Sequence, residues 1–241
     1  MAITEPLVVQ GAATFRDPQG RLYRDRDRIL REIYPEHAEP VLQWIRSGLA
    51  RRWMREGRMC STTVLDTESS QPLTLEHERV FFPTYPWEWT PGQWKHAAGL
   101  TLDLCEESLD SGYILKDATP LNILFSGPQA VFVDVLSFER RDLRNPIWLA
   151  YGQFVRAFLL PLAAHACLGW PLAGTQHRRD GFEPTDLAPW LSLTCRWHNP
   201  MRSLVTIPLL LESSFLQGAR ASSRTGRKLL RMWLRFCCAV R

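Results

Sequence analysis

One short stretch of this chain constrains its fold more than any other, because it combines two apolar blocks with a tight turn. Residues 122–125 and 130–135 are short and apolar, as strands are, and the Ser-Gly-Pro between them is typical of a turn. A hairpin of this kind brings its two ends together. We therefore expect Asn122, at the start of the first strand, to lie beside Asp134, near the end of the second.

Asp117 lies five residues before Asn122 and adds a second carboxylate to this group. Phosphoryl transfer requires one carboxylate to orient the acceptor hydroxyl and accept its proton. It also requires a carboxylate and an amide oxygen that hold magnesium against the nucleotide phosphates. The Asp-x4-Asn spacing is that of the protein-kinase catalytic loop. We expect Asp117 to be the catalytic base, Asn122 and Asp134 to bind Mg²⁺, and ATP to be the nucleotide.

A structural role is the alternative for each of these residues. Asp117 could cap a turn with Thr119 and Pro120, and Asn122 could satisfy nearby backbone groups. Asp134 ends an apolar strand, where a carboxylate is costly to bury unless it is paired or bound to a metal. It could also cap the turn that follows.

The amino-terminal part of the chain reads as mostly β. Residues 12–33 resemble a small antiparallel unit with turn chemistry at 17–20, and residues 37–56 carry apolar side chains at helical spacing. Residues 59–65 and 78–84 are strand-like.

The remainder reads as mostly helical. Thr90 and Pro91 resemble a helix start before an apolar stripe at 92–109, and the chain is helical from residue 146 onward. We expect an α+β fold of two lobes, residues 1–86 and 87–241, with a cleft between them.

Arg31 is the residue of the amino-terminal lobe that we expect to contact phosphate, paired with Glu36 or Glu39. An exposed position on the strand surface is the alternative for this arginine.

Three further residues are expected at the nucleotide. Lys116 precedes Asp117 and could balance phosphate charge, or it could be solvated. Tyr85 and Trp87 lie where the two lobes should join, and the backbone there could bind an adenine; a purely structural aromatic corner is the alternative.

Net charge and the length of the apolar runs limit which partners and which compartment we expect for this chain. The net charge is +4, and the basic stretch at 21–31 alternates with acidic residues, so we expect no nucleic-acid partner. The stretch at 224–235 predicts a basic amphipathic helix that could touch an acidic membrane, although packing on its own domain is the commoner role. Six cysteines form no C-x-x-C pair, and no stretch resembles a signal peptide or a membrane span, so we expect a cytoplasmic protein.

The segments DATPLNILF, VFVDVLSFE and WLAYGQFVRAFLLPLA resemble the amino-terminal half of a bacterial family named as SAM-dependent methyltransferases and related to a nodulation protein. That half is itself similar to the protein-kinase and aminoglycoside-phosphotransferase fold. The resemblance extends from FRDPQGRLYRDRDRILREI to a helix near 202–221 and so covers most of the chain. Family members continue into a methyltransferase domain. Because no Gly-rich strand-turn-helix loop for a nucleoside cofactor occurs here, we expect no methyltransferase activity from this chain alone.

The chain departs from the kinase pattern in three places. The turn at 17–20 has one glycine instead of a glycine-rich loop, no lysine precedes Lys95, and Val135 and Leu136 follow Asp134 where kinases have Phe-Gly. These departures favour a competing interpretation. In it, the chain is a non-catalytic kinase-like module that partners a separate methyltransferase, or a truncated remnant of one.

Overall fold

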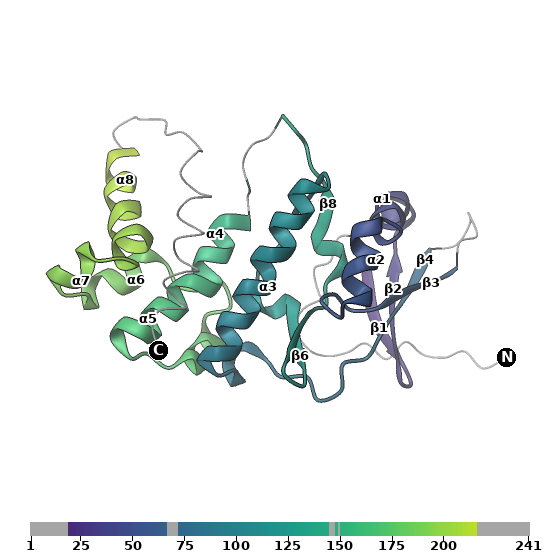
Figure 1. The fold of residues 1–241 in the computed structure, drawn as a ribbon, viewed down its shortest axis with the longest axis horizontal. Helices are drawn as coiled ribbons and strands as arrows, with labels where there is room; N and C mark the ends of the chain where they lie inside the picture. Colours follow the sequence, from purple (N-terminus) through teal and green to yellow (C-terminus); the bar gives the residue numbers. More distant parts are fainter. Residues whose placement is uncertain (1–18, 67–71, 145–147, 149, 216–241) are drawn as a thin grey trace.

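The computed structural model describes residues 19–66, 72–144, 148 and 150–215. Within them, strands concentrate in the amino-terminal part and helices in the carboxy-terminal part. Figure 1 shows a sheet with α1 and α2 at one end, α3 across the middle, and α4 to α8 at the other end. The predicted basic helix at 224–235 lies outside the described residues, and none of the described helices is long and apolar enough to cross a membrane.

The amino-terminal sheet has four antiparallel strands in the order β1-β2-β4-β3. Its first hairpin turns at Arg26 and Asp27, later than the turn chemistry at 17–20 predicts. The prediction of a strand at 78–84 is wrong. The strand in this region, β4, is five residues long and ends just before residue 78, and its Leu73, Leu75 and His77 side chains alternate inward. The bounds are β1 Gly20–Asp25, β2 Arg28–Ile33, β3 Thr62–Asp66 and β4 Leu73–His77.

The helix expected at 37–56 is two helices, α1 Pro35–Ile45 and α2 Gly48–Arg55. The break falls at Arg46 and Ser47, where the Ser47 hydroxyl accepts a hydrogen bond from Ala50 N and caps α2. Apolar spacing continues across the break, and this is why the sequence pattern alone does not reveal it.

The middle of the chain follows the prediction closely. Helix α3, Pro91–Asp110, begins with a capping box in which Gln93 N donates to Thr90 Oγ1 and Thr90 N donates to Gln93 Oε1. The predicted hairpin is present with Ile123 opposite Phe132. The remaining elements here are η1 Pro86–Glu88, β5 Tyr113–Leu115, η2 Pro120–Asn122, β6 Ile123–Ser126, β7 Gln129–Phe132, η3 Val135–Ser137 and β8 Phe138–Arg140.

The carboxy-terminal helices begin with one nearly continuous apolar helix, as predicted, which contains a π-helical turn in its middle. Phe154, Phe158 and Leu160 are fully buried on it. The bounds are α4 Ala150–Phe154, η4 Val155–Leu159, α5 Leu160–Leu168, η5 Leu172–His177, α6 Pro184–Leu187, η6 Ala188–Trp190, α7 Leu193–Trp197, η7 Arg202–Thr206 and α8 Ile207–Phe215.

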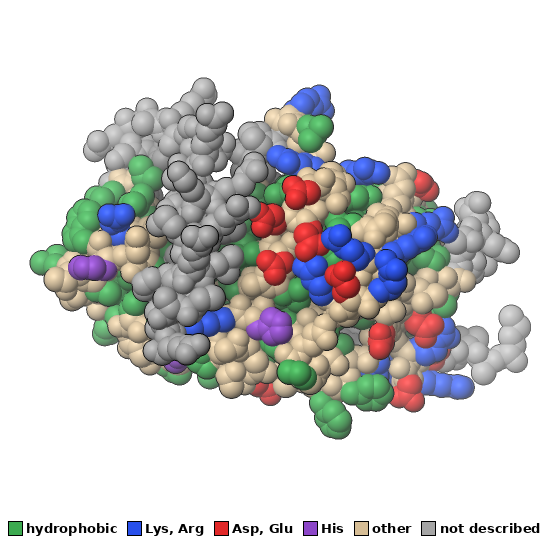
Figure 2. Space-filling view, in the orientation of Figure 1, with side chains coloured by type: hydrophobic (Ala, Val, Ile, Leu, Met, Phe, Trp, Pro, Cys, Tyr) green, Lys and Arg blue, Asp and Glu red, His purple; other side chains and the backbone are tan. Residues whose placement is uncertain are grey.

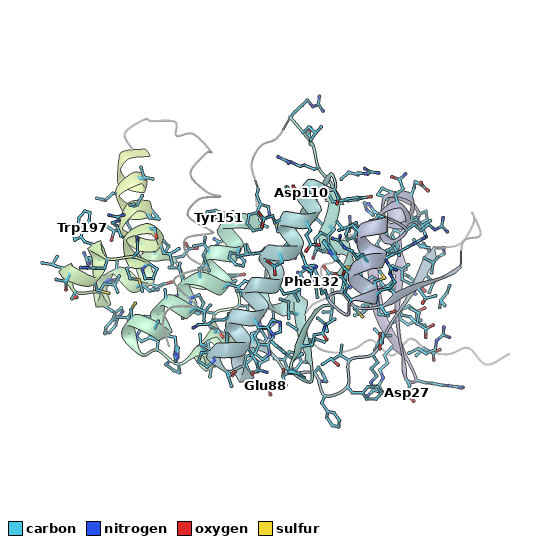
Figure 3. The ribbon with its side chains drawn as sticks, viewed as in Figure 1. Asp27, Glu88, Asp110, Phe132, Tyr151 and Trp197 are labelled. Atoms are coloured by element: carbon cyan, nitrogen blue, oxygen red, sulfur yellow. The ribbon has the colours of Figure 1, made fainter. Side chains whose placement is uncertain are left out.

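The sheet is tied to the β6–β7 hairpin through the segment that leads into β3. Met59 forms a parallel bridge with Phe132, Cys60 N donates to Phe132 O at 2.8 Å, and Phe132 N donates to Arg58 O at 2.9 Å. Phe132 is fully buried inside the molecule (Figure 3). Because Asp134 follows it by two residues, this contact also fixes where Asp134 meets the sheet.

An aromatic cluster joins α1 and α2 to the same region. The Trp44 ring stacks on Phe138 at 4.8 Å and meets Trp53 edge-on at 5.6 Å. Outside this cluster, basic and acidic side chains are interspersed over α2 and α3 (Figure 2), and Arg58 pairs there with Glu107 at 2.8 Å. The described face over these helices therefore carries charge of both signs.

Trp53→Phe should test how far the cluster depends on one buried indole. Trp53 is fully buried and its Nε1 donates to Glu107 Oε2 at 2.7 Å. Losing this bond and part of the ring should lower the free energy of unfolding by about 2 kcal/mol, measured by urea denaturation. Trp197→Phe is the control, because Trp197 is 59% exposed near the far end of the molecule (Figure 3). Equal losses in both variants would contradict this role.

Candidate functional site

Asp117 lies in the irregular segment between β5 and η2, opposite the start of the long apolar helix. Gln153 on α4 donates from Nε2 to Asp117 Oδ1 at 2.5 Å. The same amide accepts from Ala118 N at 2.7 Å through its Oε1. Gln153 therefore holds both the carboxylate and the backbone beside it in one orientation.

The electrostatics around Asp117 suit a proton acceptor. Burial raises the pKa of this carboxyl, and the nearby Asp134 also raises it, whereas the bond from Gln153 and the charge of Lys116 lower it. A carboxylate with a raised pKa is a stronger base than one in water.

Asn122 is the last residue of η2, and its amide orientation is set by two acceptors. Its Nδ2 donates to Asp117 O at 3.0 Å and to Ser137 Oγ at 3.1 Å. Because both partners accept, the nitrogen must face them and Oδ1 must face away. No hydrogen bond to Oδ1 from another described residue is present, so this oxygen remains available to a ligand.

Asp134 follows β7, and both of its oxygens are engaged. Ser137 Oγ donates to Asp134 Oδ2 at 2.6 Å, and Arg31 Nη1 donates to Asp134 Oδ1 at 3.0 Å. Ser137 thus touches both Asn122 and Asp134. The expected proximity of these two residues is present, and a buried hydroxyl lies between them.

Arg31 lies on β2, between β1 and β4, and its side chain is only 7% exposed. The alternative of an exposed strand arginine is therefore wrong. The sequence predicts Glu36 or Glu39 as the partner of Arg31, and this prediction is wrong. Both glutamates are exposed, and Glu39 accepts a hydrogen bond from Gln43 instead. Among the described residues Arg31 pairs with the carboxylate of Asp134.

The other three predicted site residues lie outside this network. Lys116 Nζ donates to Gln19 Oε1 at 3.1 Å and lies 3.9 Å from Glu139 Oε2. The Tyr85 and Trp87 rings stack on each other at 5.1 Å with an angle of 10° between their planes. The structure therefore links Asp117, Asn122, Asp134 and Arg31 through polar contacts that the side chains of Lys116, Tyr85 and Trp87 do not join.

Ser137 and Gln153 are the site residues that sequence reasoning missed. Gln153 carried a usable signal, because an amide inside a nearly all-apolar helix requires a polar partner. Ser137 carried only its position three residues after Asp134. The contact of Gln153 is not visible in local spacing, since Gln153 lies 36 residues from Asp117.

The described residues fit a magnesium ion that arrives with phosphate. They contain no group of three or more His, Cys, Asp or Glu side chains able to hold a metal by themselves. Mg²⁺ is commonly held by one or two protein oxygens, with waters and substrate phosphates completing its shell. Asn122 Oδ1 and the Asp134 carboxylate are oxygens of this kind.

His77, on β4, is a buried titratable group close to this network. Thr62 Oγ1 donates to Cys60 O at 3.1 Å, so it must accept from His77 Nδ1, 2.8 Å away. The neutral ring therefore carries its proton on Nδ1, and Nε2 is a buried acceptor without a partner among the described residues. Burial, with help from Arg31 and against the effect of Asp134, lowers the pKa of His77 to about 4.

His77→Gln should make stability less sensitive to acid. An unfolded imidazole binds its proton near pH 6.5, whereas the folded one does so at a pKa of about 4, so protonation favours unfolding. The wild type should lose about 1 kcal/mol per pH unit as the pH falls from 6.5 toward 4, and the variant should lose less. Urea denaturation at pH 7, 6 and 5 measures this. Parallel curves for the two proteins would contradict it.

Comparisons with known proteins show a distant relationship to one nodulation protein. No protein-family model matches the chain. The nodulation protein NoeA of Rhizobium meliloti (strain 1021) is 33% identical over 158 residues, which cover 63% of this chain and 32% of NoeA. The crystal structure of the Mycobacterium tuberculosis PknI kinase domain gives a TM-score of 0.30 at 14% identity, covering 57% of this chain and 61% of that domain. The chain is thus a distant homologue of NoeA that spans about a third of its length, with only a weak structural likeness to a kinase domain.

Proposed function

We propose that this chain is a two-lobed, kinase-like module that binds ATP with magnesium and transfers a phosphoryl group to a hydroxyl acceptor. The lobes would be residues 1–86 and 87–241. One observation carries the proposal. A continuous set of polar contacts links Arg31 on the sheet to Asp134, Ser137, Asn122 and Asp117.

The chemistry proposed for Asp117 is that of a general base. Its carboxylate, oriented by Gln153, would accept the proton of an acceptor hydroxyl as that oxygen attacks phosphorus. Its raised pKa makes this proton transfer more favourable. Gln153 is a positioning residue, because it acts through Asp117.

Asn122 and Asp134 would hold the metal through Asn122 Oδ1 and the Asp134 carboxylate. Magnesium, when bound, neutralises charge on the nucleotide phosphates. Arg31 would take the place of the strand lysine of kinases and contact phosphate while it holds Asp134. Lys116 would balance phosphate charge, and the backbone at Tyr85 and Trp87, rather than their rings, would bind the adenine.

The competing proposal is a non-catalytic module that partners a separate methyltransferase, or is a remnant of one. The ion pair between Arg31 and Asp134 favours it, because the carboxylate is already neutralised without a metal. The matching segment covers 32% of NoeA, so most of NoeA lies outside the region that this chain resembles.

Stabilisation by ATP with magnesium should separate these functions. A ligand that binds the native state stabilises it, by about 2.7 kcal/mol at 100 times its Kd, so the melting temperature of the wild type should rise by about 5 °C. Asn122→Ala should lose most of this rise, because it removes the available oxygen. Asp142→Asn, at an exposed residue bonded to Arg144, should keep it. Absence of any rise in the wild type would favour the non-catalytic module.

Asp117→Ala should abolish turnover without unfolding the protein. Loss of a general base lowers kcat by about 10²- to 10⁴-fold, measured as phosphate released from ATP in the absence of an acceptor. Gln153→Leu should lower it less. It should also move the acidic limb of the pH–rate profile to higher pH, because the bond from Gln153 lowers the pKa of Asp117. Full activity in Asp117→Ala would remove this residue as the base.

A further inference from the structure

A shallow pocket lies beside the loop that carries Asp117. It is bounded by η1, η2, the π-helical turn after α4 and the segment that follows η5, and its empty volume of about 320 Å³ includes open solvent, so most of it is an open depression and little of it is enclosed. Leu121 contributes one wall, from the five-residue interval between Asp117 and Asn122. The pocket therefore shares a wall with the proposed site.

The inner surface of the pocket is apolar and partly aromatic. Trp87, Trp94 and Ala157 line it together with Leu121. Trp94 is fully buried and rigidly placed, because its Nε1 donates to Pro86 O at 2.9 Å. A surface of this kind accommodates a ring or another flat apolar body.

Two arginines give the rim of the pocket a positive charge. Arg178 is held by Asp186 at 2.5 Å, and its guanidinium lies over the Phe182 ring at 5.5 Å. Arg179 is exposed and makes no ion pair or hydrogen bond with another described residue. Because no carboxylate lines the pocket among the described residues, Arg179 is a cation available to an anion.

The segment that carries these arginines is fixed by a close backbone contact. Gly181 has a φ of +86°, and a Cβ there would lie 2.1 Å from the carbonyl oxygen of Arg156. Phe182 N donates to that same oxygen at 2.9 Å. Only glycine fits this approach, so the arginine rim is held against the helix that carries Gln153.

That helix also sets the spacing between the pocket and the base. Gln153 contacts Asp117, and Ala157, four residues further along, lines the pocket. Four residues correspond to roughly one helical turn, so Gln153 and Ala157 lie close together on this helix. A ligand that reaches from Asp117 to the arginine rim would therefore be a small molecule.

We infer that this pocket binds the acceptor, and that the acceptor is a small hydroxyl compound with a ring or apolar body that carries a carboxylate, sulfate or phosphate. This inference rests on the proposed function for the role of the hydroxyl at Asp117. Arg179 binds the anionic group, Trp87 and Leu121 contact the body, and the hydroxyl points to Asp117. The binding part of the inference is testable without turnover.

Benzoate and benzyl alcohol are suitable probes, since they share a ring and differ in charge. In ¹H–¹⁵N spectra of the wild type, benzoate should shift the indole signals of Trp87 and Trp94, and benzyl alcohol should bind more weakly. Arg179→Gln should raise the Kd of benzoate about fivefold and leave that of benzyl alcohol unchanged. The control is Arg55→Gln, an exposed arginine on α2 at the other end of the molecule, which should change neither (Figure 1).

Three outcomes would overturn the inference. They are no benzoate-dependent shift of these indoles, equal affinity for the neutral and the charged probe, or equal loss in the two arginine variants. Stabilisation of the wild type by ATP with magnesium is a separate measurement. If it occurs while benzoate binding fails, the pocket is wrong and the nucleotide proposal stands. If benzoate binds through Arg179 and nucleotide does not bind, the pocket is an anion site outside phosphoryl transfer.

Discussion

The ion pair between Arg31 and Asp134 is the contact on which the rest of the site depends. It joins two residues 103 positions apart, one on the central part of the sheet and one just after β7. The Arg31 side chain is only 7% exposed and that of Asp134 25%, so loss of either partner would leave the other partly buried charge less compensated. Asp134 in turn engages Ser137, and Ser137 engages Asn122. The orientation of the proposed metal ligand therefore depends on a contact made from the sheet.

The same ion pair limits how a metal can bind. Mg²⁺ at Asp134 would place two positive charges beside a guanidinium already 3.0 Å from the carboxylate, and such charges repel each other strongly where burial excludes water. Nucleotide phosphates bring negative charge that offsets both cations. Under the proposed function, magnesium would therefore enter this site more readily as a nucleotide complex than as the free ion.

How much the sequence predicts depends on the range of the interactions. The β6–β7 hairpin and the cap at Thr90 follow from neighbouring residues, and both were predicted correctly. The partner of Arg31 was predicted wrongly, because Glu36 and Glu39 are near it in the sequence, whereas the Asp134 carboxylate comes close only in the folded chain. The clamp from Gln153 was missed for the same reason. Local spacing thus places Asp117 and Asn122, and tertiary contacts decide what holds them.

The lack of the kinase strand lysine does not by itself exclude a phosphate contact, because Arg31 could take its place. A lysine ammonium acts as a point charge, whereas a guanidinium presents five N–H donors in a fixed plane. Arg31 donates to Asp134 through Nη1, and the remaining N–H groups of its guanidinium point away from that carboxylate. Under the proposed function, Arg31 would combine a structural role with contact to phosphate, in a geometry fixed by its ion pair with Asp134. An arginine in place of the kinase lysine would alter where a bound phosphate lies, and so does not by itself decide between a catalytic and a non-catalytic module.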